Sequence, residues 1–111
     1  MRNSPTKIII SEGNKKHLFS KREIKFIKSD RYYVNIFCTH RKILIRITLK
    51  KLEEVLPPNF LRINKSVIVN TEFIVRIEET KASCSIIIPD EIEHQVTEKY
   101  KAMFDDYFAL G

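Results

Sequence analysis

Residues 59–70, NFLRINKSVIVN, interrupt an apolar stretch with a polar cluster made of Arg62, Asn64, Lys65 and Ser66. Guanidinium, amide and ammonium groups donate hydrogen bonds to phosphates and to base edges, Arg and Lys suiting guanine and Asn suiting adenine. In one unbroken strand Lys65 would share a face with Ile63 and Val67, and burying its unpaired charge would cost several kcal/mol. The sequence therefore predicts that the strand bends or breaks here. Arg62, Asn64 and Lys65 would then project as a group of donors.

The elements that hold this cluster are mostly strands. Apolar and polar residues alternate over much of residues 7–47, which is typical of antiparallel sheet. We expect strands at 7–11, 16–19, 24–28, 32–39, 43–47, 61–63, 67–69, 73–77, 84–88 and 94–96. Helical spacing of apolar residues predicts one short helix over 49–56, capped by Thr48, and another from Thr97 onward. The expected fold class is mainly β, with antiparallel strands in small packed sheets, one short internal helix and a C-terminal helix.

Three details of this pattern can be tested directly. Strict alternation places Ile24 and Phe26 on the same face of their strand. Residues 29–31 read as a loop. Glycine occurs only at positions 13 and 111, and tight hairpin turns usually need it, so we expect longer or bulged connections.

The chain of 111 residues suits one domain. We expect residues 1–6 to be a loose lead-in or the remnant of a linker, and residues 7–111 to form the domain. The sequence holds no signal peptide and no apolar run long enough to cross a bilayer, so the expected location is cytoplasmic, without membrane contact. Cys38 and Cys84 are expected to be reduced thiols, a single disulfide being the alternative.

Catalytic and metal-binding patterns are missing from the sequence. There is no glycine-rich phosphate loop, no Gly-x-Ser-x-Gly and no His-Glu-x-x-His. The three histidines, His17, His40 and His94, lack the spacing of metal ligands. We therefore expect a protein that is not an enzyme and that uses no cofactor and no metal.

Charge is divided unevenly along the chain. Residues 1–51 hold 14 Lys or Arg and 3 Asp or Glu, a net charge of +11, whereas residues 52–111 hold 6 and 11, a net charge of −5. This division favours a polyanionic partner such as nucleic acid or anionic lipid, or else a basic surface that is only solvated. Five basic residues of the first half could follow phosphates or be ordinary surface: Lys25, Lys28, Arg41, Lys42 and Arg46.

Four segments, in order, resemble a known family. Phe60-x-Arg62-Ile63-Asn64-Lys65-Ser66-x-Ile68-Val69-Asn70 resembles the signature of LytTR-type DNA-binding domains, which usually read Phe-x-Arg-Ile-His-Arg-Ser-x-Ile-Val-Asn. Residues 24–29 followed by 32–36 are similar to the family's strand, loop and strand around a Tyr-Val pair. Leu49-x-x-Leu52-Glu53-x-x-Leu56-Pro57 matches its internal helix, and Val96-Thr97-Glu98-Lys99-Tyr100 resembles its closing Val-Ser-Arg-Arg-Tyr. The resemblance covers about residues 7–108.

The resemblance implies a sequence-specific double-stranded DNA-binding domain that acts in transcription regulation. The family's small sheets send loops into the major groove of paired direct repeats in promoters and bend the DNA. Its members are mostly output domains of bacterial two-component response regulators, so an upstream receiver domain is an expected partner. Carried over by motif, Lys65 is the main base contact, with Asn64 beside it and Arg62 and Ser66 in the same cluster. Arg31 and Tyr32 occupy the second contact.

Departures from the family pattern affect what is recognised. Asn64 and Lys65 replace the common His and Arg, and Lys lacks the bidentate fork of Arg, so the preferred base can differ. At the third contact Glu98 stands where the family has its first Arg. Lys99 can take over this contact, or Glu98 can accept from a cytosine amine, or Glu98 can stabilise the first turn of the final helix.

Other interpretations of the same residues remain open. The polar cluster can be a solvated bend, and Tyr32 can belong to the core. The first rival function is single-stranded nucleic-acid binding on a stacking face of Tyr32, Tyr33 and Phe37. The second is a protein-interaction module that uses the aromatic C-terminal helix or an exposed sheet edge.

Overall fold

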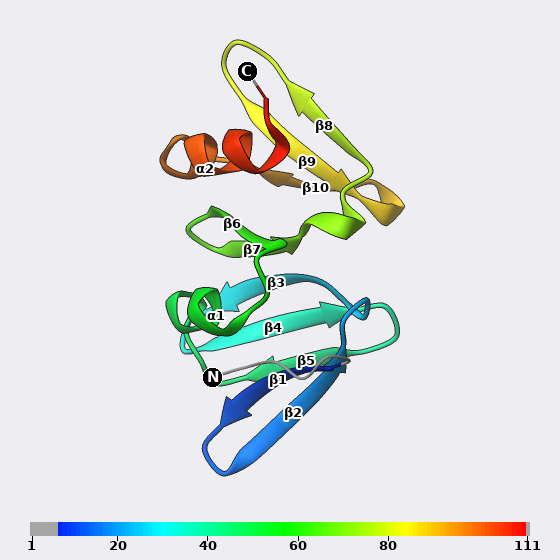
Figure 1. Cartoon of the computed structure of the whole chain (residues 1–111), viewed down its shortest axis with the longest axis vertical. Coiled ribbons are helices and arrows are strands. Elements are labelled where there is room, and N and C mark those ends of the chain that lie inside the picture. Colours follow the sequence, from blue (N-terminus) through cyan, green and yellow to red (C-terminus); the bar gives the residue numbers. More distant parts are fainter. Residues whose placement is uncertain (1–6, 111) are drawn as a thin grey trace.

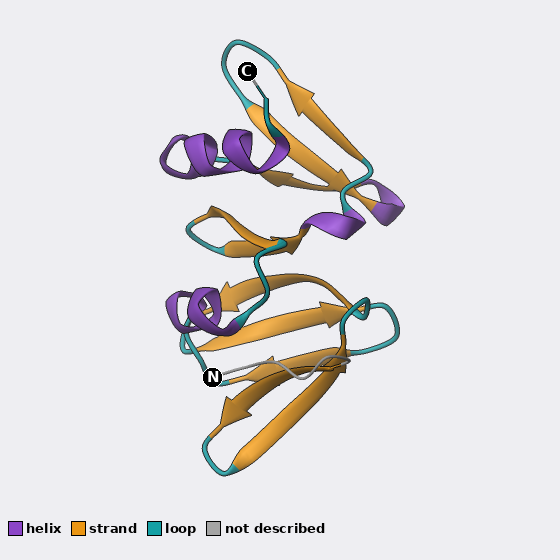
Figure 2. Ribbon diagram, viewed as in Figure 1, coloured by secondary structure: helices purple, strands orange, loops and turns teal. Residues whose placement is uncertain are grey.

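The computed structural model describes residues 7–110, so the expected lead-in at residues 1–6 lies outside the described residues. The strands are β1 (Lys7–Glu12), β2 (Lys15–Ser20), β3 (Ile24–Asp30), β4 (Tyr33–Cys38), β5 (Lys42–Ile45), β6 (Phe60–Asn64), β7 (Val67–Asn70), β8 (Arg76–Glu79), β9 (Cys84–Ile88) and β10 (Ile92–Gln95). The helices are α1 (Leu49–Val55), α2 (Glu98–Phe108) and the short 3₁₀ turns η1 (Thr71–Phe73) and η2 (Pro89–Glu91). This confirms the expected fold class (Figure 2).

A five-stranded antiparallel sheet of order β5-β4-β3-β7-β6 forms the centre of the molecule. The β1–β2 hairpin and the three-stranded sheet β10-β9-β8 are separate from it. Figure 1 shows the β1–β2 hairpin at one end of the molecule, α1 at the level of β3 and β4, and β8–β10 with α2 towards the other end. The central sheet is therefore covered by different elements on its two faces.

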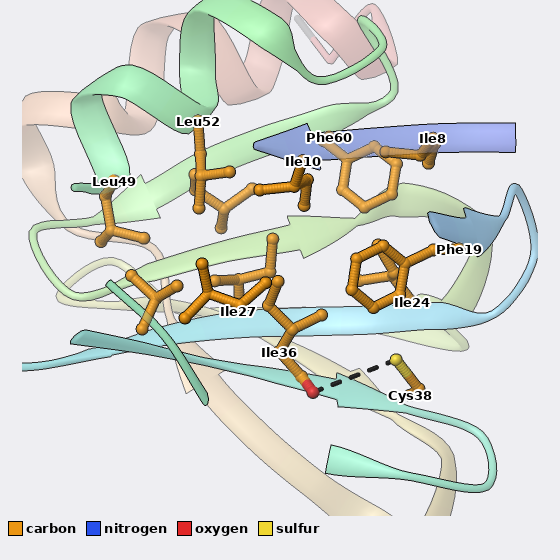
Figure 3. Packing of buried hydrophobic residues seen from close by; sticks show 13 residues of the cluster. Ile8, Ile10, Phe19, Ile24, Ile27, Ile36, Cys38, Leu49, Leu52 and Phe60 are labelled. Carbon is orange, nitrogen blue, oxygen red and sulfur yellow. Dashed lines mark hydrogen bonds between the residues drawn. The ribbon is translucent and has the colours of Figure 1, made fainter. Parts of the chain in front are cut away.

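Two apolar cores lie on the two faces of the central sheet. The first core joins Ile36, Ile45 and Ile68 of the sheet to Ile10 of β1 and Leu52 of α1, all of them fully buried. Figure 3 shows this packing. The second core joins sheet residues to the opposite layer: Leu61, Ile63, Val67, Val69, Ile86, Ile88 and Phe104. Strand β7 is buried along its whole length because both cores contact it.

A bulge in β3 corrects the predicted faces of that strand. The pairing of β3 with β4 shifts register between Ile24 and Phe26. Ile24 and Ile27 consequently belong to the first core and Phe26 to the second. The prediction that Ile24 and Phe26 share a face is wrong, because one extra residue in a strand reverses the alternation beyond it.

Three hairpins have tight connections despite the scarcity of glycine. Residues 13–14, 31–32 and 65–66 are the only residues between their paired strands. The prediction of longer or bulged connections is wrong at the first two turns, and β3 continues through the predicted loop as far as Asp30. At the third turn the predicted bulge is present. Gly13 supplies a φ of 59° at the first turn, and Arg31 adopts a φ of 60° at the second. The third turn follows a bulge between Arg62 and Asn64, where the strand was predicted to bend.

The helices and the last strands begin close to their predicted positions. The Thr48 side chain accepts a hydrogen bond from the backbone N–H of Lys51 at 3.1 Å, as expected for the cap of α1. The predicted strand at 73–77 is replaced by η1 and by β8, which begins at Arg76. The buried Asn70 side chain caps η1 by accepting from the Glu72 N–H at 3.0 Å and donates to the Ile24 carbonyl at 2.8 Å. Asn70 is therefore a structural residue.

Both cysteines are free and buried. The Cys38 thiol faces the Ile36 carbonyl in the first core (Figure 3). Burial, reinforced by the nearby Glu23 carboxylate, raises the pKa of the Cys38 thiol to about 11, so the thiol stays protonated at neutral pH. Within residues 7–110 no helix has the length and apolar character needed to span a membrane.

Candidate nucleic-acid interface

One side of the molecule gathers segments that are distant in sequence. The β3–β4 turn, the β5–α1 loop, the β6–β7 turn and the start of α2 all lie on the left side of Figure 1. Two open grooves cross this side. The first is lined by residues of the β3–β4 turn, the β5–α1 loop and the β6–β7 hairpin, and the second by residues of the β6–β7 turn and α2. Lys65 lines both grooves and so lies between them.

Arg62 points into the protein rather than away from it. Its guanidinium donates to the Glu53 carboxylate on α1 at 2.7 Å and to the backbone carbonyls of Asn64 and Lys65 at 2.9 and 2.6 Å. It also lies 5.4 Å from the centre of the Tyr100 ring, and only 14% of its side chain is exposed. Arg62 therefore ties the β6–β7 turn to α1 and α2, and does not project as the sequence predicted.

Asn64 is used in a similar way. Its side-chain carbonyl accepts from the Ser66 N–H at 2.8 Å, which closes the turn locally, as Asn side chains commonly do. Its amide donates to the Gln95 carbonyl of β10 at 2.8 Å. The two bonds hold the turn against the neighbouring sheet. Of the three donors expected to project together, only Lys65 does so.

Lys65 and Ser66 form the tip of this fixed turn. The Lys65 side chain is exposed, and no ion pair or hydrogen bond of its ammonium is found within residues 7–110. The Ser66 carbonyl accepts from the Ser29 N–H of β3 at 2.9 Å, which joins the tip to the central sheet. The ammonium is thus presented to solvent from a rigid backbone.

Arg31 and Tyr32 form the β3–β4 turn beside the first groove. Both are exposed, Tyr32 with 75% of its surface, so Tyr32 does not belong to the core. The Arg46 guanidinium carbon lies 6.0 Å from the centre of the Tyr32 ring and 5.9 Å from that of Tyr33. Such distances permit cation–π attraction, which orders an otherwise free tyrosine.

The start of α2 borders the second groove. Lys99 is exposed and its ammonium lies 5.6 Å from the centre of the Tyr100 ring. Glu98 is the first residue of α2, where a carboxylate interacts favourably with the helix dipole. The geometry thus gives Glu98 a stabilising position in the helix and leaves Lys99 accessible beside Lys65.

Sequence reasoning missed Lys50 and gave Arg46 no special weight. Both are exposed and line the first groove with Arg31 and Lys65. The signal that could have found them is their position immediately around Thr48, the predicted helix cap, because the start of α1 adjoins this groove. Arg41, by contrast, lies at the other end of β4 and is paired with Glu23 at 2.6 Å.

Comparison with known proteins identifies the fold. A model of the family described as the LytTr DNA-binding domain matches residues 14–109. The chain belongs to the LytTR family. A solved chain from Bacillus cereus, described as the LytTr DNA-binding domain of a methyl-accepting/DNA response regulator, has a similar fold with a TM-score of 0.78 and 15% identity, covering 95% of this chain and 98% of that chain. No curated protein matches the sequence.

Membership of the LytTR family confirms the predicted resemblance and the main function. The protein is a double-stranded DNA-binding domain of the type that response regulators use in transcription regulation. Neither rival is favoured. Phe37, one member of the proposed stacking face, already stacks on Phe26 with ring centres 4.4 Å apart. In the aromatic stripe of α2, Phe104 is buried and so packs inside the protein.

Proposed function

We propose that this LytTR domain reads DNA by placing the β6–β7 turn in the major groove, with Lys65 as its principal base contact. The observation that carries this proposal is the difference between Lys65 and its neighbours. Arg62 and Asn64 use their side chains inside the protein, whereas Lys65 is exposed at the tip that they fix. Because the turn is already fixed, its backbone loses little conformational freedom on binding.

The role of Arg62, Asn64 and Ser66 is then to hold the β6–β7 turn in position, so that Lys65 can contact the base. The Arg62 and Asn64 hydrogen bonds hold the turn from α1, α2 and β10, and the Ser66 carbonyl joins it to β3. Any contact that their remaining polar atoms make with DNA is secondary to this role. A single lysine at the tip suits guanine, whose N7 and O6 atoms accept hydrogen bonds in the major groove.

Arg31 and Tyr32 provide a second contact, and Lys99 a third. Arg31 and Lys65 both line the first groove, and Lys65 and Lys99 both line the second. A cation on each side of the central turn is placed to meet phosphates on either side of a groove, where phosphate contacts fix register and base contacts give specificity. Glu98 contributes to the start of α2 and is not needed for DNA contact.

The biological setting follows from the family. We propose that the domain recognises direct repeats in promoters and receives its signal from an upstream receiver domain in the cytoplasm. Its role is binding rather than catalysis. Two copies bound to adjacent half-sites would each use the same Lys65 contact.

The test is selection of duplexes from a random library at ~150 mM salt, using the unchanged domain, Lys65→Ala and Lys21→Ala. Lys21 is a matched control because it is exposed in the β2–β3 turn, at the opposite end of β3 from Arg31. The unchanged domain and Lys21→Ala should enrich the same repeated motif. Lys65→Ala should lose ~1–3 kcal/mol of discrimination at one position in each half-site.

Two results would overturn the proposal. If Lys65→Ala selects the same motif with the same preference at every position, Lys65 is not the base contact. If no repeated motif is enriched by the unchanged domain, the recognition of direct repeats is wrong.

A further inference from the structure

Arg46 is an exposed residue whose guanidinium lies near two aromatic rings. It follows β5 and lies beside the rings of Tyr32 and Tyr33, at 6.0 and 5.9 Å from their centres. Tyr32 belongs to the turn that carries Arg31, Tyr33 is the first residue of β4, and all four residues line the first groove. The guanidinium therefore lies beside aromatic rings that line a groove, and no ion pair of it is found within residues 7–110.

The backbone of Arg46 is anchored from a different layer of the fold. Its N–H donates to the Glu12 carboxylate at 2.7 Å, and Glu12 also interacts with His17 at 3.0 Å across the β1–β2 hairpin. The hydrogen bond from Arg46 is the main reason that the pKa of the Glu12 carboxyl is lowered. The hairpin thus reaches the β5–α1 loop through one ionised carboxylate that binds the backbone of Arg46 and leaves its guanidinium free.

Pairing separates the arginines into two groups. Arg41, Arg62 and Arg76 are each bonded to glutamate side chains. Within residues 7–110, no ion pair is found for Arg22, Arg31 or Arg46. Arg31 and Arg46 line the same groove, and Lys50 adds a third cation without an ion pair there. A concentration of unneutralised cations around one groove favours a polyanionic ligand.

We propose that Arg46 contacts a DNA phosphate from the first groove, and that Glu12 positions Arg46 for this contact. The inference rests on the proposed function, because it assumes that the side of the molecule carrying Lys65 faces the DNA. It adds a phosphate contact outside the polar cluster and gives the β1–β2 hairpin a part in DNA binding. A guanidinium suits this role because it binds phosphate through paired hydrogen bonds.

The first measurement compares Arg46→Ala with Arg22→Ala in equilibrium binding to a selected duplex and to an unrelated duplex, at several salt concentrations. Arg46→Ala should weaken binding to both duplexes roughly fivefold at ~150 mM salt and reduce the salt slope of log affinity by about 0.9. Arg22→Ala removes another exposed arginine, for which no ion pair is found within residues 7–110, at the far end of β3, and should leave both quantities unchanged.

Substitution of Glu12 provides a sharper test, because an effect of net charge and a positioning role predict opposite changes in DNA affinity. Removal of a carboxylate should strengthen DNA binding if only net charge matters. If Glu12 positions Arg46, Glu12→Ala should instead weaken binding and reduce the salt slope, whereas Glu12→Gln, which keeps an acceptor for the Arg46 N–H, should retain most of the affinity. The double variant Glu12→Ala/Arg46→Ala should bind no more weakly than Arg46→Ala, because Glu12 acts through Arg46.

The outcomes separate this inference from the proposed function. An unchanged salt slope in Arg46→Ala, or stronger binding by Glu12→Ala, overturns the inference even if Lys65→Ala loses base discrimination. If Lys65→Ala and Arg46→Ala both bind like the unchanged domain, the DNA-binding side itself is wrong and both proposals fail. Urea unfolding of each variant distinguishes lost contacts from lost folding.

Discussion

Arg31 combines an unfavourable backbone with an accessible side chain. Its φ of 60° lies in the left-handed region, where residues with a Cβ are disfavoured and glycine is at ease. Its side chain is exposed, and no ion pair of it is found in the described part of the chain. Local strain at an exposed tip points to a role other than stability. At the scale of single residues, Arg31 thus resembles Lys65: each is an exposed turn residue whose side chain is better explained by binding than by stability.

Arg31→Gly should therefore separate stability from DNA binding. Glycine accepts the left-handed conformation, so the free energy of unfolding in urea should stay constant or rise by up to about 1 kcal/mol. Affinity for a selected duplex should fall, because a cation facing phosphate is lost. Arg22→Gly, in the β2–β3 turn, serves as the control for loss of an exposed arginine. A variant that binds DNA as well as the unchanged domain would exclude Arg31 from the contact.

At the scale of elements, β10 connects the small sheet to the central sheet through His94. The His94 ring lies 4.6 Å from the Phe26 ring of β3, centre to centre, and its Nε2 atom is buried without a hydrogen-bond partner in the described chain. Burial, with a smaller contribution from the positive charge of Lys28, lowers the pKa of His94. Protonation of His94 would place an unsatisfied charge between the two sheets. The next residue, Gln95, holds the side chain of Asn64.

This arrangement predicts a pH-dependent stability. Because the pKa of His94 is lower in the folded chain than its ordinary value of 6.5, the unfolded chain binds more protons between these two values, and stability falls as the pH falls through this range. Urea unfolding between pH 7.5 and about 5.5 should show the decrease, and His94→Phe should reduce it. His40→Gln, at an exposed loop position, should not. Equal pH dependence in His94→Phe and the unchanged domain would contradict the prediction.

The sequence predicted elements better than it predicted what their side chains do. Alternation located strands such as β4, in which buried residues alternate with less buried ones, and the ends of α1 could be read from Thr48 and the two prolines. The bulge in β3 was missed because it shifts the pairing of β3 with β4, and no residue type in the strand marks where the shift occurs. Arg62 and Asn64 were misplaced because an arginine and an asparagine in a turn can serve DNA or the turn itself, and only Glu53 and Gln95, distant in sequence, decide between these uses.

At the scale of the whole molecule, the position of the charges is more informative than the net charge. Five cations line the two grooves on one side and have no ion pair within the described residues: Arg31, Arg46, Lys50, Lys65 and Lys99. In the acidic second half of the chain, some carboxylates are neutralised by ion pairs within that half. Arg76 binds Glu78 and Glu91, and Lys101 binds Glu79 and Asp105. The net charge of +6 is therefore a poor measure of the field that DNA meets.

Two double variants of equal net charge test this organisation. Lys50→Gln/Lys99→Gln removes two cations from the grooves, whereas Lys21→Gln/Arg22→Gln removes two from the β2–β3 turn. If each of the four cations other than Lys65 neutralises one phosphate, these contacts should give the unchanged domain a salt slope of log affinity of about −3.6. The first variant should then show about −1.8, while the second keeps the original slope. Equal slopes for the two double variants, measured on the same duplex, would mean that net charge governs binding and that DNA does not meet this side in preference to the rest of the surface.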